Sequence, residues 1–309
     1  MNKNKLSGLF TYPLRSVIDN ASIDINFLQE IRMRTGRPLM VTYKGKSYFA
    51  KADGDLSNNK DNAVIVDNKM LMETIQIFSS YSFYAFEEEV RQGVLTIPGG
   101  HRVGICGKAV IENRAVKTIK DISSINIRIA HQVVGCADAL IDKLFNGKEF
   151  CNTLIVSAPG GGKTTLLRDL IRQVSNGDDT CVGFSVGVVD ERSEIAACYR
   201  GIPQNDIGIR TDVLDCCPKQ EGMMMLLRSM SPDVIAVDEI GQEKDYEALL
   251  QAMFCGTKIM ATVHGASYED LLNKPVLSKL IEQKVFERII ILKSREVDRI
   301  LDVNGNLIE

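Results

Sequence analysis

The segment at 157–165 has the residue types and spacing of a loop that holds phosphate groups. Its glycines allow backbone N–H groups to wrap around phosphate oxygens, Lys163 adds a positive charge, and Thr164 offers a hydroxyl ligand to Mg²⁺. Apolar runs before and after the loop predict a buried strand at 154–156 and a helix over 166–174 whose positive end points at the phosphates. The segment therefore predicts a P-loop that binds Mg-ATP. Its residues are Ser157, Ala158, Pro159, Gly160, Gly161, Gly162, Lys163, Thr164 and Thr165.

The first position of this loop departs from the usual pattern, because Ser157 stands where a glycine is common. A glycine-rich turn that binds nothing is the alternative interpretation. The strand predicted before the loop and the helix predicted after it are, however, the context that a P-loop requires. We expect Lys163 to act as a phosphate point charge in a solvent-open loop and not as a core residue.

Two carboxylates follow a second predicted strand at 234–237. In a Walker B motif, the first acid, here Asp238, acts on the water shell of Mg²⁺, and the second, here Glu239, acts on the attacking water. Acids after a strand are also common at helix N-termini, where they suit the helix dipole. Beside a P-loop, the pair favours hydrolysis of ATP.

Two further apolar runs, at 186–189 and 259–263, also end in polar residues. Asp190, Glu191 and Arg192 follow the first, and His264 follows the second. Because the carboxyl ends of parallel strands meet at one edge of a sheet, these side chains are expected near the P-loop. Glu191 would position water or metal there, or form a surface salt bridge. His264 would sense the γ-phosphate, or only bridge loops by hydrogen bonds.

Arginine appears scarce near the P-loop, whereas the first half of the chain has Arg32, Arg34, Arg102 and Arg128. Phosphoryl transfer gains most from an arginine that arrives across an interface. We therefore expect Arg102, or next Arg128, to reach the ATP of a neighbouring subunit. The alternative for each is an ordinary exposed charged residue.

Two domains are expected from the length and the pattern of elements. Residues 1–130 mix short strands and helices and predict a smaller α+β domain, with an amphipathic helix near 67–80 and a turn at 98–100. From about Ile125 strands alternate with helices, so residues 131–309 predict a RecA-like α/β domain with a mostly parallel central sheet. In the tail, a strand at 289–292 and the pair Asn304 and Gly305 predict a hairpin.

The composition limits the partners. Over 309 residues the net charge is −3, and the pI is near 5.8, which argues against a protein that grips nucleic acid along its backbone. Eight scattered cysteines without a C-x-x-C pair favour reduced thiols in a cytoplasmic protein. No apolar run approaches the roughly 20 residues needed to cross a bilayer, and no signal peptide is recognised. We expect neither a nucleic-acid partner nor direct membrane insertion.

Several segments resemble the stage III sporulation protein AA family of endospore-forming bacteria. They include Arg-Thr-Asp-Val-Leu-Asp at 210–215 and Leu-Arg-Ser-Met-Ser-Pro-Asp-Val at 227–234, which runs into Asp-Glu-Ile-Gly at 238–241. With the P-loop, 189–195, 31–34 and 100–104, the resemblance covers nearly the whole chain. This family looks like a branch of the type II and type IV secretion ATPases.

The resemblance implies a mother-cell cytoplasmic ATPase, peripheral to a membrane complex. It also implies a hexameric ring that energises membrane-embedded channel proteins between mother cell and forespore. By match to the secretion-ATPase pattern, Asp190 and Glu191 stand at the acidic box, and His264 stands at the histidine box. A single-strand nucleic-acid-binding ATPase is one alternative, although the Arg-x-x-x-His module of such chains is absent. An ATP-gated scaffold is another, against which Glu239 argues.

Overall fold

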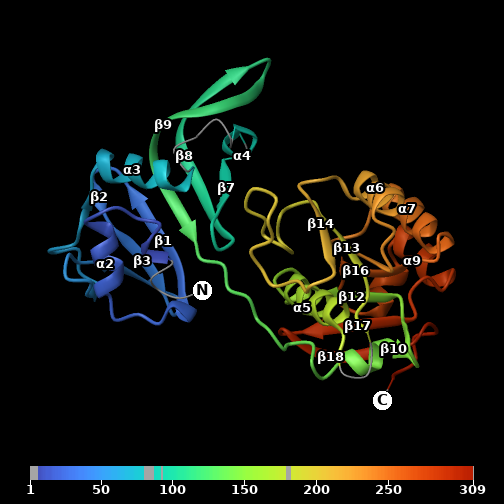
Figure 1. Cartoon of the computed structure of the whole chain (residues 1–309). Helices are drawn as coiled ribbons and strands as arrows, with labels where there is room; N and C mark the ends of the chain where they lie inside the picture. The colour runs from blue at the N-terminus through green and yellow to red at the C-terminus, as the bar shows by residue number, and fades with distance from the viewer. Residues whose placement is uncertain (1–5, 80–86, 92, 179–181, 309) are drawn as a thin grey trace. The chain divides into compact units, whose positions relative to one another are not determined.

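The computed structural model describes residues 6–79, 87–91, 93–178 and 182–308. The chain divides into two compact units, Met1–His131 and Gln132–Glu309 (Figure 1). A seven-stranded sheet forms the centre of each unit, antiparallel in the first and mostly parallel in the second. The α+β and α/β architectures predicted from the sequence are therefore confirmed.

The sheet of the first unit has the order β5-β4-β3-β1-β9-β8-β7, with all pairs antiparallel. Its central strand β1 turns Leu28, Ile31 and Met33 into the core, and a register shift after Leu28 explains the uneven spacing. The strands are β1 Leu28–Arg34, β3 Met40–Tyr43, β4 Lys46–Ala50, β5 Leu56–Ser57, β7 Val94–Ile97, β8 His101–Glu112 and β9 Ala115–Arg128. A separate pair consists of β2 Arg37–Pro38 and β6 Ile65–Val66.

The amphipathic helix predicted near 67–80 is confirmed as α3, Asn68–Phe78. Asp67 caps it by accepting a hydrogen bond from the Met70 N–H at 2.7 Å. Ile75 and Phe78 are buried on its inner face. The other short helices of this unit are α2 Leu14–Asn20, η1 Ile25–Phe27 and α4 Glu87–Arg91.

A long hairpin of β8 and β9 extends this sheet (Figure 1). The turn expected at 98–100 does join β7 to β8. At the tip of the next hairpin, Asn113 and Arg114 have left-handed φ values of 51° and 63°. Residues 125–128 belong to β9, so the expectation that strand–helix alternation starts near Ile125 is wrong. Ile125 and Ile127 alternate with Asn126 and Arg128, which is the pattern of a strand with one covered face and suits this antiparallel sheet.

In the second unit the strand order is β14-β13-β15-β16-β12-β17-β18, and β18 alone is antiparallel to its neighbour. The strands are β12 Thr153–Ser157, β13 Val186–Asp190, β14 Thr211–Asp215, β15 Val234–Val237, β16 Lys258–His264, β17 Arg288–Lys293 and β18 Glu296–Leu301. The helices are α5 Lys163–Asn176, α6 Lys219–Ser229, α7 Glu243–Phe254, α8 Tyr268–Leu272 and α9 Pro275–Glu282. Before β12 lie η3 Ile141–Leu144, β10 Phe145–Asn146 and β11 Glu149–Phe150.

Helices cover both faces of this parallel sheet. Ile155 of β12 belongs to the core cluster of α5, with Leu170, whereas the neighbouring Leu154 belongs to that of α7, with Leu249. All four side chains are fully buried. Because both faces are covered, the central strands are mostly apolar, and apart from Thr262 within β16 their polar side chains lie near the strand ends.

The C-terminal hairpin differs from the expectation. The strand predicted at 289–292 is β17, but it turns into β18 through Ser294 and Arg295, whose φ values are 52° and 70°. The turn predicted at Asn304 and Gly305 does form, but it leads only to a single bridge between Leu301 and Leu307. The sequence signal at 304–305 is real, and the larger hairpin was missed because its turn has no glycine or asparagine.

Candidate nucleotide-binding and catalytic site

The loop at 157–165 joins the end of β12 to the start of α5. Gly160 and Gly162 have φ values of 71° and 92°, a left-handed conformation that glycine adopts without strain. Gly162 is the N-cap of α5. Left-handed residues beside a helix N-terminus turn successive N–H groups toward one point, which is how such loops bind anions.

The unusual Ser157 is accommodated by a glycine four residues later. Its side chain is buried, and its Oγ donates to the Ala158 carbonyl at 3.0 Å. A Cβ added at Gly161 would collide with this Oγ. The serine therefore occupies space that Gly161 leaves open, and a glycine at position 157 is unnecessary because this residue is still part of strand β12.

Lys163 is buried, with 5% of its surface exposed, so the expectation of a solvent-open lysine is wrong. Its Nζ donates to His264 Nδ1 at 2.9 Å and to the Ser157 carbonyl at 3.4 Å. Burial lowers the pKa of Lys163, while the charges of Glu239 and Asp238 act in the opposite direction. The acceptors of the ammonium group are thus a ring nitrogen and a backbone carbonyl.

Asp238 and Glu239 follow β15, directly beside the loop. Thr164 Oγ1 donates to one oxygen of Asp238 at 2.8 Å, and Thr262 Oγ1, from β16, donates to the other. The same Thr262 hydroxyl accepts the Glu239 N–H at 2.9 Å. That bond holds Glu239 in a left-handed conformation, φ 52°, which costs a non-glycine residue backbone energy.

The donor atoms at Thr164 and Asp238 are hard oxygens, the type that Mg²⁺ prefers. Mg²⁺ at nucleotide sites usually keeps only one or two protein ligands and takes the rest from phosphates and water. In the described part of the chain no group of three or more His, Cys, Asp or Glu residues is arranged to hold a metal ion by itself. The pair therefore fits a magnesium ion that arrives with the nucleotide.

His264 ends β16 and connects the lysine to the second acid. Its Nε2 lies 2.8 Å from Glu239 Oε1 while its Nδ1 faces Lys163. A neutral ring that accepts at Nδ1 and donates at Nε2 satisfies both contacts. The Arg192 guanidinium lies 3.3 Å from the other oxygen of Glu239. Lys163, His264, Glu239 and Arg192 thus form one continuous polar chain.

The acids after β13 have two different surroundings. Asp190 is buried, and its carboxylate accepts the N–H groups of Glu194, Ile195 and Ala196, so it shapes the following loop. Burial raises the pKa of Asp190, and those N–H groups oppose the rise. Glu191 forms an ion pair with Lys219 at 2.8 Å. Glu191 thus forms the salt bridge that was one of its two expected roles. It also lines a small cleft with Asp238 and Glu239, which is compatible with the other role, positioning water or metal.

The expectation that arginine is scarce near the P-loop is wrong. Arg168, one turn into α5, donates to the Glu194 and Ile195 carbonyls at 2.6 Å and braces the acidic loop. Arg192 reaches Glu239, and Arg295 lies against Gly162. Arg192 was identifiable because it follows the acid pair. Sequence alone offers no signal for Arg295, which reaches the loop from another strand.

A family model described as "Sporulation stage III, protein AA" matches residues 1–306. The chain belongs to this family. The stage III sporulation protein AA of Bacillus subtilis (strain 168) is 42% identical over 285 residues, which span 91% of this chain and 89% of that protein. A protein named ycf45 in Cyanidium caldarium is 26% identical over 198 residues, 63% of this chain and 53% of that protein. The family resemblance deduced from the sequence is confirmed.

Solved structures of secretion and pilus ATPases share the fold of this stage III AA family member. The Legionella pneumophila ATPase DotB aligns with a TM-score of 0.55 and 16% identity, over 90% of this chain and 78% of that one. The pilus retraction motor PilT with bound ADP aligns with a TM-score of 0.57 and 16% identity, over 85% and 74%. At this level of identity the likeness concerns the fold alone.

The two arginines expected to act across an interface lie in the first unit of this stage III AA protein. Arg102 of β8 and Arg128 of β9 are direct cross-strand partners, and Arg128 is also paired in register with Glu30 of β1. Their role toward a neighbouring nucleotide stays a prediction. No helix in the described residues is both long and apolar enough to cross a membrane.

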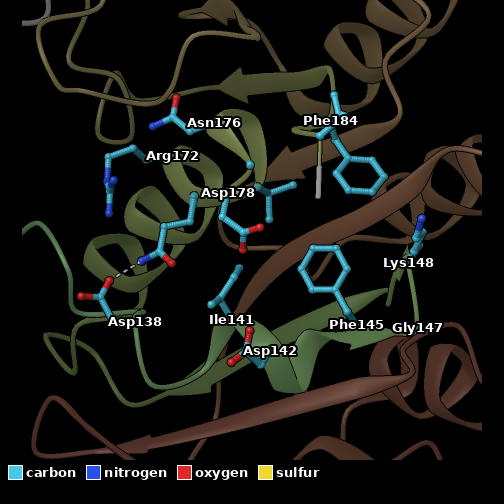
Figure 2. A pocket seen from close by; sticks show the side chains of 14 residues that line it. Asp138, Ile141, Asp142, Phe145, Gly147, Lys148, Arg172, Asn176, Asp178 and Phe184 are labelled. Atoms are coloured by element: carbon cyan, nitrogen blue, oxygen red, sulfur yellow. Dashed lines mark hydrogen bonds between the residues drawn. The ribbon is translucent and has the colours of Figure 1, made fainter. Parts of the chain in front are cut away.

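A pocket of about 660 Å³ lies at the C-terminal end of α5, away from the P-loop (Figure 2). Phe145 and Phe184 form one wall, with ring centroids 6.0 Å apart. On another wall Asp138 accepts a hydrogen bond from Gln173 at 2.8 Å. The lining residue Arg172 lies roughly 14 Å along α5 from Lys163 at its start. None of the predicted site residues lines it.

Proposed function

We propose that this stage III AA family member is an ATP-hydrolysing motor of the secretion-ATPase type. One observation carries the proposal: Lys163, Thr164, Asp238, Glu239 and His264 contact one another at the carboxyl edge of the parallel sheet. They come from helix α5 and from the ends of two strands, β15 and β16, so only the fold brings them together. Such a set serves phosphoryl transfer to water.

The P-loop N–H groups and Lys163 bind the β- and γ-phosphates. When phosphate oxygens take the Lys163 ammonium, His264 loses its partner at Nδ1 and is free to face the γ-phosphate. This rearrangement transmits the presence of a third phosphate to Glu239, because the other ring nitrogen of His264 contacts that carboxylate. When bound, Mg²⁺ neutralises phosphate charge, and Thr164 and Asp238 are the groups that would hold it.

In the hydrolysis step Glu239 orients a water molecule and accepts a proton from it. The water oxygen bonds to the γ-phosphorus as the bond to the β,γ-bridging oxygen breaks, and that oxygen leaves with the electron pair on ADP. Lys163 neutralises the charge that develops on the leaving group. The Arg192 guanidinium, 3.3 Å from one oxygen of Glu239, helps to hold this carboxylate in place.

The test is ATP turnover measured on protein separated by size, with light scattering in the presence and absence of ATP. We expect nucleotide-dependent assembly, with phosphate release confined to the assembled species. Turnover that needs added single-stranded nucleic acid would favour a nucleic-acid-binding ATPase. Assembly with ATP binding but no turnover would favour an ATP-gated scaffold.

The assembly proposed is a hexameric ring in the mother-cell cytoplasm. It would dock on membrane-embedded channel proteins that connect mother cell and forespore. In this ring Arg102, or else Arg128, would reach the nucleotide of the neighbouring subunit. The support is that phosphoryl transfer benefits from a cation whose arrival depends on domain movement.

Mixed rings test the role of Arg102. The variant Arg102→Ala should bind ATP normally and turn over slowly, and mixing it with Lys163→Ala should restore part of the activity, because each subunit supplies what its neighbour lacks. If co-assembled subunits show no recovery, Arg102 acts within its own chain or only structurally. The same mixing experiment then applies to Arg128.

A further inference from the structure

The turn between β17 and β18 lies directly on the phosphate loop. If Gly162 carried a Cβ, that atom would lie 3.6 Å from both Cα and Cβ of Arg295 and 3.7 Å from its Cγ. These are ordinary van der Waals distances, so the Arg295 residue packs over the N-cap of α5. An arginine therefore borders the end of the helix that binds phosphate.

The Arg295 guanidinium has no hydrogen bond or ion pair with any other residue that the structure describes. The other cations of the same hairpin are paired: Lys293 and Arg299 both contact Asp298, at 2.9 and 3.4 Å. A positive charge beside a phosphate loop, without a protein partner, is free to bind an anionic ligand.

Strand order fixes which end of a nucleotide this arginine meets. β12, which leads into the loop, has β16 on one side and β17 on the other. His264 ends β16, and Asp238 and Glu239 follow β15 beyond it, so the reacting γ-phosphate belongs on that side. The remainder of the nucleotide then extends toward β17 and its turn. Arg295 stands on that opposite side of the loop.

The two residues of the β17–β18 turn are of types that do not favour its backbone conformation. Both Ser294 and Arg295 are left-handed, the conformation of a two-residue hairpin turn for which asparagine and glycine are preferred. An arginine at the second position is strained in the left-handed conformation, whereas a glycine would not be. The β8–β9 turn has the same pair of left-handed residues, with Arg114 at the second position, and provides a matched control within the chain.

We propose that Arg295 binds the α-phosphate end of the nucleotide and completes the phosphate site from the side opposite Asp238 and Glu239. The inference rests on the proposed function, since it assumes that the P-loop binds a nucleoside polyphosphate. It predicts that Arg295 contributes equally to the affinity for nucleoside di- and triphosphates, because both carry an α-phosphate. Residues on the γ-phosphate side should instead distinguish ATP from ADP.

The experiment is calorimetric titration of the full chain with ATP and with ADP, each with Mg²⁺. Arg295→Gly should weaken both affinities by a similar factor, about 5- to 10-fold for one exposed charge-assisted contact. Arg114→Gly, which makes the same backbone change at the equivalent turn position, should leave both unchanged. Arg295→Lys should retain part of the lost affinity because it keeps the charge.

Thermal unfolding separates binding from folding. Glycine suits a left-handed position, so Arg295→Gly should unfold at the same temperature as the wild type or higher. Unchanged affinity for both nucleotides would overturn the proposal, and so would a loss confined to ATP, which would move Arg295 to the γ-phosphate. A loss of affinity accompanied by a lower unfolding temperature, without rescue by lysine, would make the role structural. If the wild type binds neither nucleotide, the proposed function itself fails.

Discussion

The two ends of helix α5 both gather charged side chains, but these side chains have different partners. In the C-terminal half, Arg172 pairs with Asp169, which lies midway along the helix. The Asp169 carboxylate also accepts hydrogen bonds from the Ala137 N–H and the Gln173 side chain, so it anchors the chain segment that precedes the sheet. At the N-terminal end, the polar groups instead gather around glycines whose N–H groups have room for an anion.

In this fold the volume of a pocket is therefore a poor guide to its chemistry. The pocket near Arg172 is roomy, but Arg172 and Asp138 in its lining are hydrogen-bonded to Asp169 and Gln173. The cleft beside Glu239 is small, yet it is lined by Asp238 and Glu239, the residues whose chemistry suits a nucleotide site. If the comparison is right, substitutions at one end of α5 affect nucleotide chemistry, and those at the other end do not.

Glu239→Gln should have the largest effect. The amide keeps the shape and the contact with the loop but cannot accept a proton, so phosphate release should fall by ~10²-fold or more, with ATP still bound. Glu243→Gln, an exposed acid four residues later that pairs with Lys279, is the matched control and should change turnover little. Wild-type turnover in Glu239→Gln would transfer the role to Glu191.

Lys163→Ala should come next, with ATP affinity lowered about 100-fold, because several charge-assisted contacts to phosphate disappear together. Circular dichroism should show an intact fold. Lys163→Met, which keeps the apolar stem, should unfold at the same temperature or higher, since burial disfavours the charged amine. Unchanged ATP affinity by calorimetry in Lys163→Ala would rule out the P-loop assignment.

Thr262→Val should slow turnover about tenfold with a smaller change in ATP affinity. The substitution removes the hydroxyl that holds both Asp238 and the Glu239 N–H, and a lost buried hydrogen bond costs about 1–3 kcal/mol. Thr257→Val is the control, because Thr257 makes a comparable buried bond to the Pro232 carbonyl just before the opposite end of β16. Equal loss of turnover per folded molecule in both variants would mean that Thr262 only stabilises the strand.

Arg172→Ala should have the smallest effect, with ATP affinity within about twofold of the wild type, because its partner is Asp169 and not the loop. Calorimetry with ATP measures it directly, and loss of the ion pair should appear only as a small decrease in unfolding temperature. An affinity loss as large as that of Lys163→Ala would break the distinction between the two ends of α5.

The features of this site that can be predicted from the sequence are those that lie within short segments. The glycine spacing around Lys163 and the acids after apolar strands are local patterns. Strand β14, Thr211–Asp215, was missed because its polar ends leave no apolar run to recognise. Its assignment depends on pairing with β13, which a local pattern does not contain.

Contacts between distant segments were out of reach for a physical reason. The burial of Lys163 depends on His264, 101 residues away, and the position of Arg295 depends on how β17 turns. Neither follows from residue type, because lysine and arginine are usually exposed. The sequence analysis underestimated the arginines near Glu239 for the same reason.

Strand β16 has a mechanical consequence that its side chains do not reveal. It lies between β12 and β15, and its peptide groups pair with Ser157 on one side and Val237 on the other through His264 and Ala261. The distance from the end of β12, which leads into the P-loop, to the end of β15, which precedes Glu239, is therefore two strand spacings, roughly 10 Å. Because backbone hydrogen bonds set this distance, we expect side-chain substitutions to leave it unchanged. A force applied to the covering helices should move the three strands together and keep the distance constant.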